Sequence, residues 1–110
     1  MDIEELLERY RQLADRYAPA RAQREYLDEY KKSMLALLMK DAERQGYNSG
    51  VAQEREARAN DNYLVLLDNL KTAVFEEEKI RYHMKATEWE IEIWRTKSAN
   101  ERAERRAYGA

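Results

Sequence analysis

A seven-residue repeat of apolar positions runs through the C-terminal half of this sequence. One series is Tyr63, Leu70, Glu77, Met84 and Ile91, and the other is Leu66, Ala73, Ile80, Thr87 and Trp94. A repeat held over this length predicts a helix that packs at a shallow angle against another helix, as in a coiled coil. We therefore expect a long helix over residues 61–106, and its run from 62 to 106 would extend roughly 65 Å at 1.5 Å per residue.

Two more helices are predicted from the first 45 residues. Apolar residues recur at three- and four-residue spacing from Ile3 to Tyr17, and Asp2 can cap the start of this first helix. Pro19 has no amide hydrogen and disfavours helix in the residue before it, so it should end or kink the first helix and begin a second. We expect helices over 2–17 and 19–45. The segment "SMLALLMK" is apolar nearly all round, which predicts that the second helix is the most buried.

Turn and capping residues divide the rest of the chain. In "QGYNSG" at 45–50, Gly46 suits a left-handed helix C-cap and Ser49 suits an N-cap. The "NDN" at 60–62 favours a short helix over 49–59 followed by a new helix capped by Asp61, although one uninterrupted helix is the alternative. The sequence thus predicts a single all-α domain over residues 1–110, a helical hairpin or bundle with a long C-terminal helix.

The long helix also predicts self-association. The helices expected before it are each shorter, so part of its apolar stripe should meet a partner, most simply a second copy of the chain. Glu77 lies on that stripe and is expected either to pair with an arginine or lysine across the seam or to sit at a wet gap. Trp94 lies on the stripe and Trp89 off it, which indicates contacts on two faces. The predicted interface residues are Tyr63, Leu66, Leu70, Glu77, Ile80, Met84, Trp89, Ile91 and Trp94.

The residues for common enzymatic sites are not found together in the sequence. There is no cysteine and only one histidine, His83, and no glycine-rich phosphate loop is present. Helical di-metal sites use Glu-x-x-His pairs, but Ile80 stands three residues before His83. The acidic run 76–78 has no second half of a catalytic motif. We therefore expect a protein that is not an enzyme and that needs no metal or cofactor.

The end of the chain carries a basic strip. Residues 95–110 hold five basic and two acidic residues, whereas 76–92 hold six acidic and three basic residues. The strip consists of Arg95, Lys97, Arg102, Arg105 and Arg106. Three interpretations stay open: a solvated helix end whose cations suit the helix dipole, an antiparallel head-to-tail assembly, or contact with single-stranded nucleic acid. The overall net charge of −2 argues against a surface built for duplex DNA.

The N-terminus gives an expectation of location. "MDIEELLERY" is acidic and amphipathic, without the basic start and apolar core of a signal peptide. The apolar stretch from Leu35 to Met39 is far too short to span a bilayer. A cytoplasmic protein without membrane contact is expected.

The segment 61–104 resembles a group of small helical proteins encoded by phages and prophages, often near genes for single-strand annealing recombinases or replication. The residues that carry the resemblance are Asp61, Tyr63, Leu66, Leu67, Leu70, Arg81, Trp94, Arg95 and Thr96. The resemblance covers less than half of the chain. It implies an accessory protein of phage DNA metabolism in the bacterial host cell, acting by contact with a recombination or replication protein.

Overall fold

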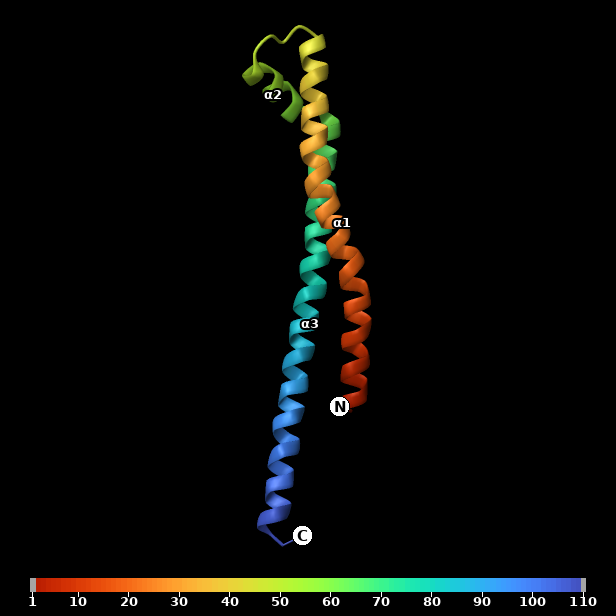
Figure 1. Ribbon diagram of the computed structural model, residues 1–110, viewed down its shortest axis with the longest axis vertical. Coiled ribbons are helices and arrows are strands. Elements are labelled where there is room, and N and C mark those ends of the chain that lie inside the picture. The colour runs from red at the N-terminus through yellow and green to blue at the C-terminus, as the bar shows by residue number, and fades with distance from the viewer. Residues whose placement is uncertain (1, 110) are drawn as a thin grey trace. The chain divides into compact units, whose positions relative to one another are not determined.

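The computed structural model describes residues 2–109 and contains three helices (Figure 1). They are α1 (Ile3–Arg44), α2 (Gly50–Arg58) and α3 (Asp61–Ala107). No strand occurs between residues 2 and 109. The predicted all-α class and the long C-terminal helix are confirmed. The internal contacts group the chain into unit 1, which is Met1–Ala18 with Glu78–Ala110, and unit 2, which is Pro19–Glu77.

The structure has one helix, α1, where the sequence predicted two. Pro19 lies inside it. The side chains on both sides of the proline explain this, because Leu13, Tyr17, Ala20 and Arg24 keep an alternating four- and three-residue spacing and are all buried or half-buried. Pro19 itself is exposed. The carbonyl of the residue four positions earlier, which loses its amide partner, therefore lies on a side of the helix that water can reach.

Both ends of α1 are capped as predicted. The carboxylate of Asp2 accepts a hydrogen bond from the amide of Glu4 at 3.2 Å. At the other end, Gly46 has a φ of 105°, the left-handed conformation that glycine adopts without strain. The amide of Gly46 donates to the Glu43 carbonyl and the amide of Tyr47 to the Ala42 carbonyl, each at 3.1 Å. These two bonds form a Schellman motif and satisfy carbonyls that the helix leaves free.

A break separates α2 from α3, as the "NDN" segment predicts. Ser49 caps α2, because its hydroxyl accepts from the Ala52 amide at 3.1 Å. The cap of α3 is Asn60 rather than the predicted Asp61. The Asn60 side chain accepts from the Asn62 amide at 2.8 Å, and its carbonyl accepts from the Leu64 amide at 3.1 Å. Asp61 is instead the first helical residue, where its charge suits the positive end of the helix dipole.

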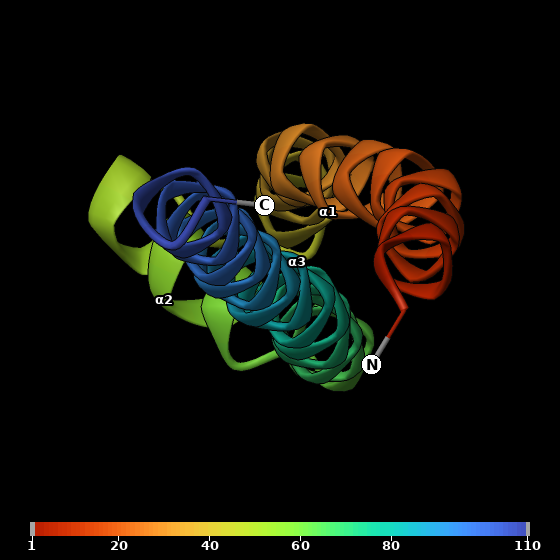
Figure 2. The same cartoon turned by 90° about the horizontal axis from the view of Figure 1, so that it is seen from below.

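In each unit, the segments of α1 and α3 lie side by side and antiparallel (Figures 1 and 2). The core of unit 1 contains Leu6, Leu13, Ile80 and Thr87. The core of unit 2 consists of Leu27, Ala42, Ala57, Tyr63, Leu66 and Glu77. Ala57 comes from α2, which thereby covers part of the helix pair in unit 2. Each core is one row of side chains per helix, as expected for two helices that meet along a heptad seam.

The segment "SMLALLMK" is not the most buried part of the chain, so that prediction is wrong. Leu37 is 58 % exposed, and Met34, Leu35, Leu38 and Met39 are half-buried. Within unit 2 the segment packs along only one side, because α2 is nine residues long and contributes a single buried residue. The segment is apolar nearly all round, which predicted that it would be buried on every side. Too few helices neighbour it in unit 2 to cover all of these sides.

Candidate protein-interaction surfaces

The predicted interface residues on the heptad stripe of α3 pack mainly against the chain's own helices. Tyr63, Leu66, Glu77 and Ile80 are buried, and Leu70, Met84 and Ile91 are half-buried. Trp94 is 38 % exposed. Trp89, which lies off the stripe, is the most exposed of the predicted interface residues, at 65 %. The two helices predicted from the first 45 residues were too short to cover this heptad stripe, which we call the inner stripe. Because α1 is continuous, it supplies a packing partner for the stripe in both units.

Glu77 forms an ion pair with Arg24 inside unit 2. The Arg24 guanidinium donates from Nε to Oε2 of Glu77 at 2.6 Å and from Nη2 to Oε1 at 3.2 Å. Its Nη1 also donates to Asp28 at 3.1 Å. The side chain of Glu77 is only 7 % exposed and that of Arg24 is 27 % exposed. These hydrogen bonds, first the one to Glu77, raise the pKa of Arg24 above its ordinary value. The predicted pairing of Glu77 with an arginine or lysine across the seam is confirmed.

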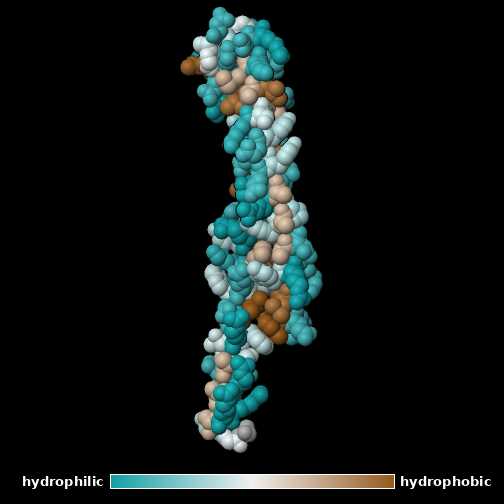
Figure 3. All heavy atoms as spheres, viewed as in Figure 1, coloured by the Kyte–Doolittle hydropathy of each residue, from teal (hydrophilic) through white to brown (hydrophobic). Residues whose placement is uncertain are grey.

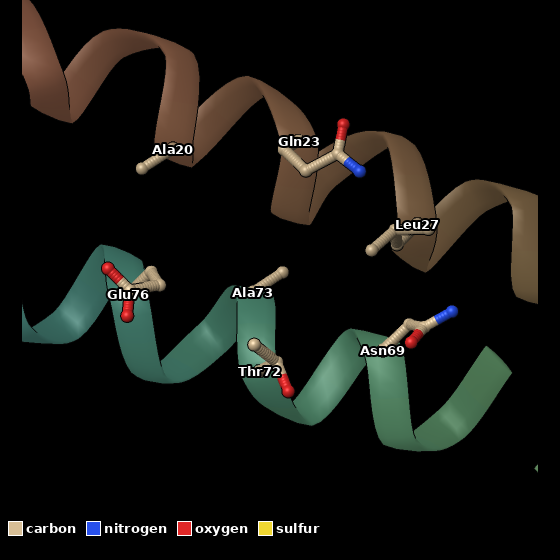
Figure 4. A pocket seen from close by; sticks show the side chains of 7 residues that line it. All are labelled: Ala20, Gln23, Leu27, Asn69, Thr72, Ala73 and Glu76. Atoms are coloured by element: carbon tan, nitrogen blue, oxygen red, sulfur yellow. The ribbon is translucent and has the colours of Figure 1, made fainter. Parts of the chain in front are cut away.

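A shallow groove lies beside this ion pair in unit 2 (Figure 4). It has a volume of about 340 Å³ and opens where Ala20 of α1 and Ala73 of α3 are too small to fill the seam. Its lining consists of Ala20, Gln23 and Leu27 from α1 and Asn69, Thr72, Ala73 and Glu76 from α3. Glu76 is the one ionisable side chain in this lining, and Gln23 and Asn69 contribute amide groups.

Polar contacts flank the helix seam of unit 1. The Tyr10 hydroxyl donates to Glu88 at 2.8 Å, and this hydrogen bond raises the pKa of Tyr10. Arg9 pairs with Glu90 at 3.3 Å. Apolar groups gather where the first turns of α1 meet α3 (Figure 3). Leu7 and Trp89 line a groove on one side of this seam, and Leu6, Ile93 and Trp94 line a groove on the other.

α3 has a second row of apolar residues on the side opposite the inner stripe. Within unit 1 this row includes Tyr82, Trp89 and Ile93, which are 62 %, 65 % and 56 % exposed. At about 100° per residue, these three side chains point within about 40° of one another around the helix. We call this row, together with Ala86 between its members, the outer stripe. Only Trp89 in it was singled out from the sequence. The signal that could have found the others is the four- and three-residue spacing that they share.

The basic strip forms an exposed surface near the end of α3. Arg95, Arg102 and Arg106 lie within about 40° of one another around the helix, and Glu101 and Glu104 lie on other sides of it. Arg95 pairs with Glu92 at 3.0 Å. Lys97 and Arg105 are exposed outside this row. Three arginines of the strip therefore share one side of α3, and Glu101 and Glu104 do not interrupt that side.

Neither His83 nor the acidic run 76–78 forms a metal cluster in the described part of the chain. No group of three or more histidine, aspartate or glutamate side chains between residues 2 and 109 is placed to hold a metal ion. His83 is exposed, and its backbone carbonyl accepts a hydrogen bond from the hydroxyl of Thr87 at 2.9 Å. Glu78 pairs with Arg81. His83 and Glu78 thus make these contacts with other residues of α3.

The described residues define an all-α protein with two long helices and one short helix, and within each unit the segments of α1 and α3 run antiparallel. Comparisons with protein-family models, with curated proteins and with solved structures give no match to this chain. Among the described residues, no helix is both long enough and apolar enough to cross a membrane.

Proposed function

We propose that this chain is a non-enzymatic helical protein that self-associates and acts by contact with another protein. The observation that carries the proposal is the outer stripe, where two aromatic residues and an isoleucine are more than half exposed along one side of α3. Scattered single apolar residues are ordinary on a protein surface, but an aligned row is typical of an interaction site. Tyrosine and tryptophan are also the residues that contribute most to protein interfaces.

The setting we propose is phage DNA recombination or replication in the cytoplasm of a bacterial host. Its support is the resemblance of residues 61–104 to small phage-encoded helical proteins. In this setting the chain would be an accessory factor whose partner is a recombination or replication protein. A pull-down from the native host followed by mass spectrometry tests this part of the proposal. Recovery of only unrelated proteins would contradict it.

Self-association is tested by light scattering at micromolar concentration. The unchanged chain is expected to show the mass of an oligomer. Trp89→Gln combined with Ile93→Gln should weaken the association at least tenfold, since these side chains supply exposed apolar area at the centre of the outer stripe. Leu37→Gln is the matched control, because Leu37 is equally exposed but lies on α1. A clean monomer for the unchanged chain would contradict the proposal.

A second candidate function is binding of single-stranded nucleic acid by the basic strip. The observation in its favour is the row of Arg95, Arg102 and Arg106 along one side of α3, with Arg105 exposed beside it. Arginines spaced along a surface can follow a phosphate backbone, and nearby aromatic side chains can stack on bases. This candidate belongs to a different class from the first and does not require self-association.

Changing Arg102, Arg105 and Arg106 to glutamate tests this candidate. If each contacts a phosphate, affinity for an oligonucleotide should fall more than tenfold. The slope of log affinity against log salt should decrease by about two, at roughly 0.7 per lost contact. Fluorescence anisotropy over a salt series measures both quantities. Lys40→Glu on α1 is the control for a general change in net charge. If the unchanged chain does not bind at low salt, the candidate is excluded.

A further inference from the structure

The outer stripe follows a complete heptad pattern of its own. Its spacing alternates between three and four residues, and all its members are exposed. One position is added at each end of the outer stripe from here on, Lys79 and Thr96, so that its positions in unit 1 are Lys79, Tyr82, Ala86, Trp89, Ile93 and Thr96. The inner stripe, with Ile80, Thr87 and Ile91, lies on the opposite side of the helix, as the angle of about 100° per residue requires. α3 is thus patterned for helix packing on two faces, and α1 covers only one of them.

We propose that the outer stripe binds the outer stripe of a second copy of this chain, with the two α3 helices antiparallel. The inference rests on the proposed self-association and specifies its surface, orientation and register. In this register, Ala86 of each copy lies opposite Trp89 of the other. The contact centres between these two residues and includes residues 79–96 of both copies, about 27 Å of helix.

The side chains of the outer stripe fit each other in this register. Tyr82 of one copy lies opposite Ile93 of the other, so an aromatic ring meets a branched aliphatic side chain. The small Ala86 lies opposite the large Trp89, so the combined volume of each layer stays similar. At the edges, Lys79 lies opposite Thr96, which keeps the ammonium group near solvent and away from another cation. Alternation of large and small residues across facing positions is what close packing of two helices needs.

The charges beside the outer stripe select the same register. In an antiparallel pair, Lys85 lies beside Glu92 of the other copy and His83 beside Glu90, and each contact occurs twice by symmetry. Lys85, His83 and Glu92 are exposed, and Glu90 is half-buried. Within its own chain, Glu90 also pairs with Arg9 and Glu92 with Arg95. A carboxylate accepts several hydrogen bonds, so both glutamates can make a further contact.

Neighbouring registers place like charges together. A shift by one heptad in one direction places Glu90 beside Glu90 of the other copy, and Glu92 beside Glu92 of the other copy. A shift in the other direction brings Lys85 against Lys85. Like charges at these flanking positions destabilise a helix pair and are a common way to exclude wrong registers.

The core residues argue against a parallel arrangement. In a parallel pair in register, every position of the outer stripe meets itself. Lys79 would lie against Lys79, and a layer of two tryptophans at position 89 would follow a layer of two alanines at position 86. The first contact is repulsive and the second pair of layers packs unevenly. The flanking charges alone would permit the parallel form, so the core residues decide the orientation.

Charge reversal tests the register. Lys85→Glu is expected to weaken the dimer about tenfold, because two exposed ion pairs of up to about 1 kcal/mol each are lost. Adding Glu92→Lys exchanges the two charges and should restore most of the affinity. In a parallel dimer Lys85 would lie beside Glu90 and Glu92 beside Lys97, so the same double variant would weaken association further. Sedimentation equilibrium measures each dissociation constant, and no recovery in the double variant would overturn the inference.

Site-specific cross-linking provides a second test, because the chain has no natural cysteine. Lys85→Cys and Glu92→Cys are purified separately, then treated with a short bis-maleimide either alone or mixed. The antiparallel register predicts a covalent dimer in the mixture at several times the yield of either variant alone. A dimer by light scattering without this preference would overturn the inference and leave the proposed self-association intact. A monomer by light scattering would overturn both.

Discussion

Replacing Glu77 by leucine is expected to lower the free energy of unfolding by about 2–3 kcal/mol. The substitution leaves the Arg24 guanidinium facing an apolar side chain in the seam of unit 2, where the carboxylate now accepts two of its hydrogen bonds. Removing one partner of a buried ion pair costs about 3–5 kcal/mol. We expect less here because Arg24 is 27 % exposed and keeps Asp28. Urea denaturation followed by circular dichroism measures the change at a fixed protein concentration.

The double variant Arg24→Leu/Glu77→Leu separates the loss of the pair from the unpaired charge. Two leucines in a heptad seam pack well, so the double variant should recover most of the stability lost in the single variant. Glu76→Leu is the surface control, since Glu76 is exposed one residue away. If Glu77→Leu alone is as stable as the unchanged chain, the ion pair contributes nothing to stability. If the double variant is no better than the single one, the loss comes from side-chain shape.

This ion pair shows how far the sequence could specify the seam. Glu77 was recognised as a charge on an apolar stripe, because α3 has a clear repeat on both sides of it. Its partner Arg24 was not recognised. Arg24 lies on the inner side of α1. Because a helix break was predicted at Pro19, the apolar spacing of residues 3–17 was not continued to Arg24. A charged residue on a helix of uncertain phase is indistinguishable from a surface residue.

Local capping chemistry was predicted more accurately than helix continuity. Asp2, Gly46 and Ser49 act as expected because a cap depends on the residue and its near neighbours. Continuation through Pro19 goes against the local signal, because proline by itself favours a helix end or a kink. The unbroken spacing of inner residues from Leu13 to Arg24 is the signal that could have predicted it.

Only one residue of the outer stripe, Trp89, was named from the sequence, and the stripe itself was not predicted. Lys79, Ala86 and Thr96 are not strongly apolar, so the second repeat is hidden by residues that also suit a solvated helix face. The structure was needed to show that α1 covers the inner stripe in unit 1 and leaves Tyr82 and Ile93 exposed. Sequence periodicity finds a helix face but does not say which face a neighbour occupies.

Pro19→Ala is expected to raise the free energy of unfolding by about 2 kcal/mol. Proline in a helix interior is about 3 kcal/mol less favourable than alanine, because it removes one backbone hydrogen bond and its ring crowds the carbonyl four residues earlier. The exposed position lets water satisfy part of that loss in the natural chain, and proline also restricts the unfolded chain. Both effects reduce the expected gain below the full difference. Urea denaturation measures it.

The reciprocal variant, Ala22→Pro, tests whether the effect comes from the backbone hydrogen bond that proline removes. Ala22 is exposed in α1 three residues after Pro19, so the ring would meet no buried neighbour there. We expect a loss of about 3 kcal/mol from the same missing hydrogen bond. In Pro19→Ala, amide hydrogen exchange should show a newly protected amide at residue 19, donating to the Asp15 carbonyl. A variant that is less stable than the natural chain would contradict the expected gain. The restriction that proline places on the unfolded chain would then outweigh the missing backbone hydrogen bond.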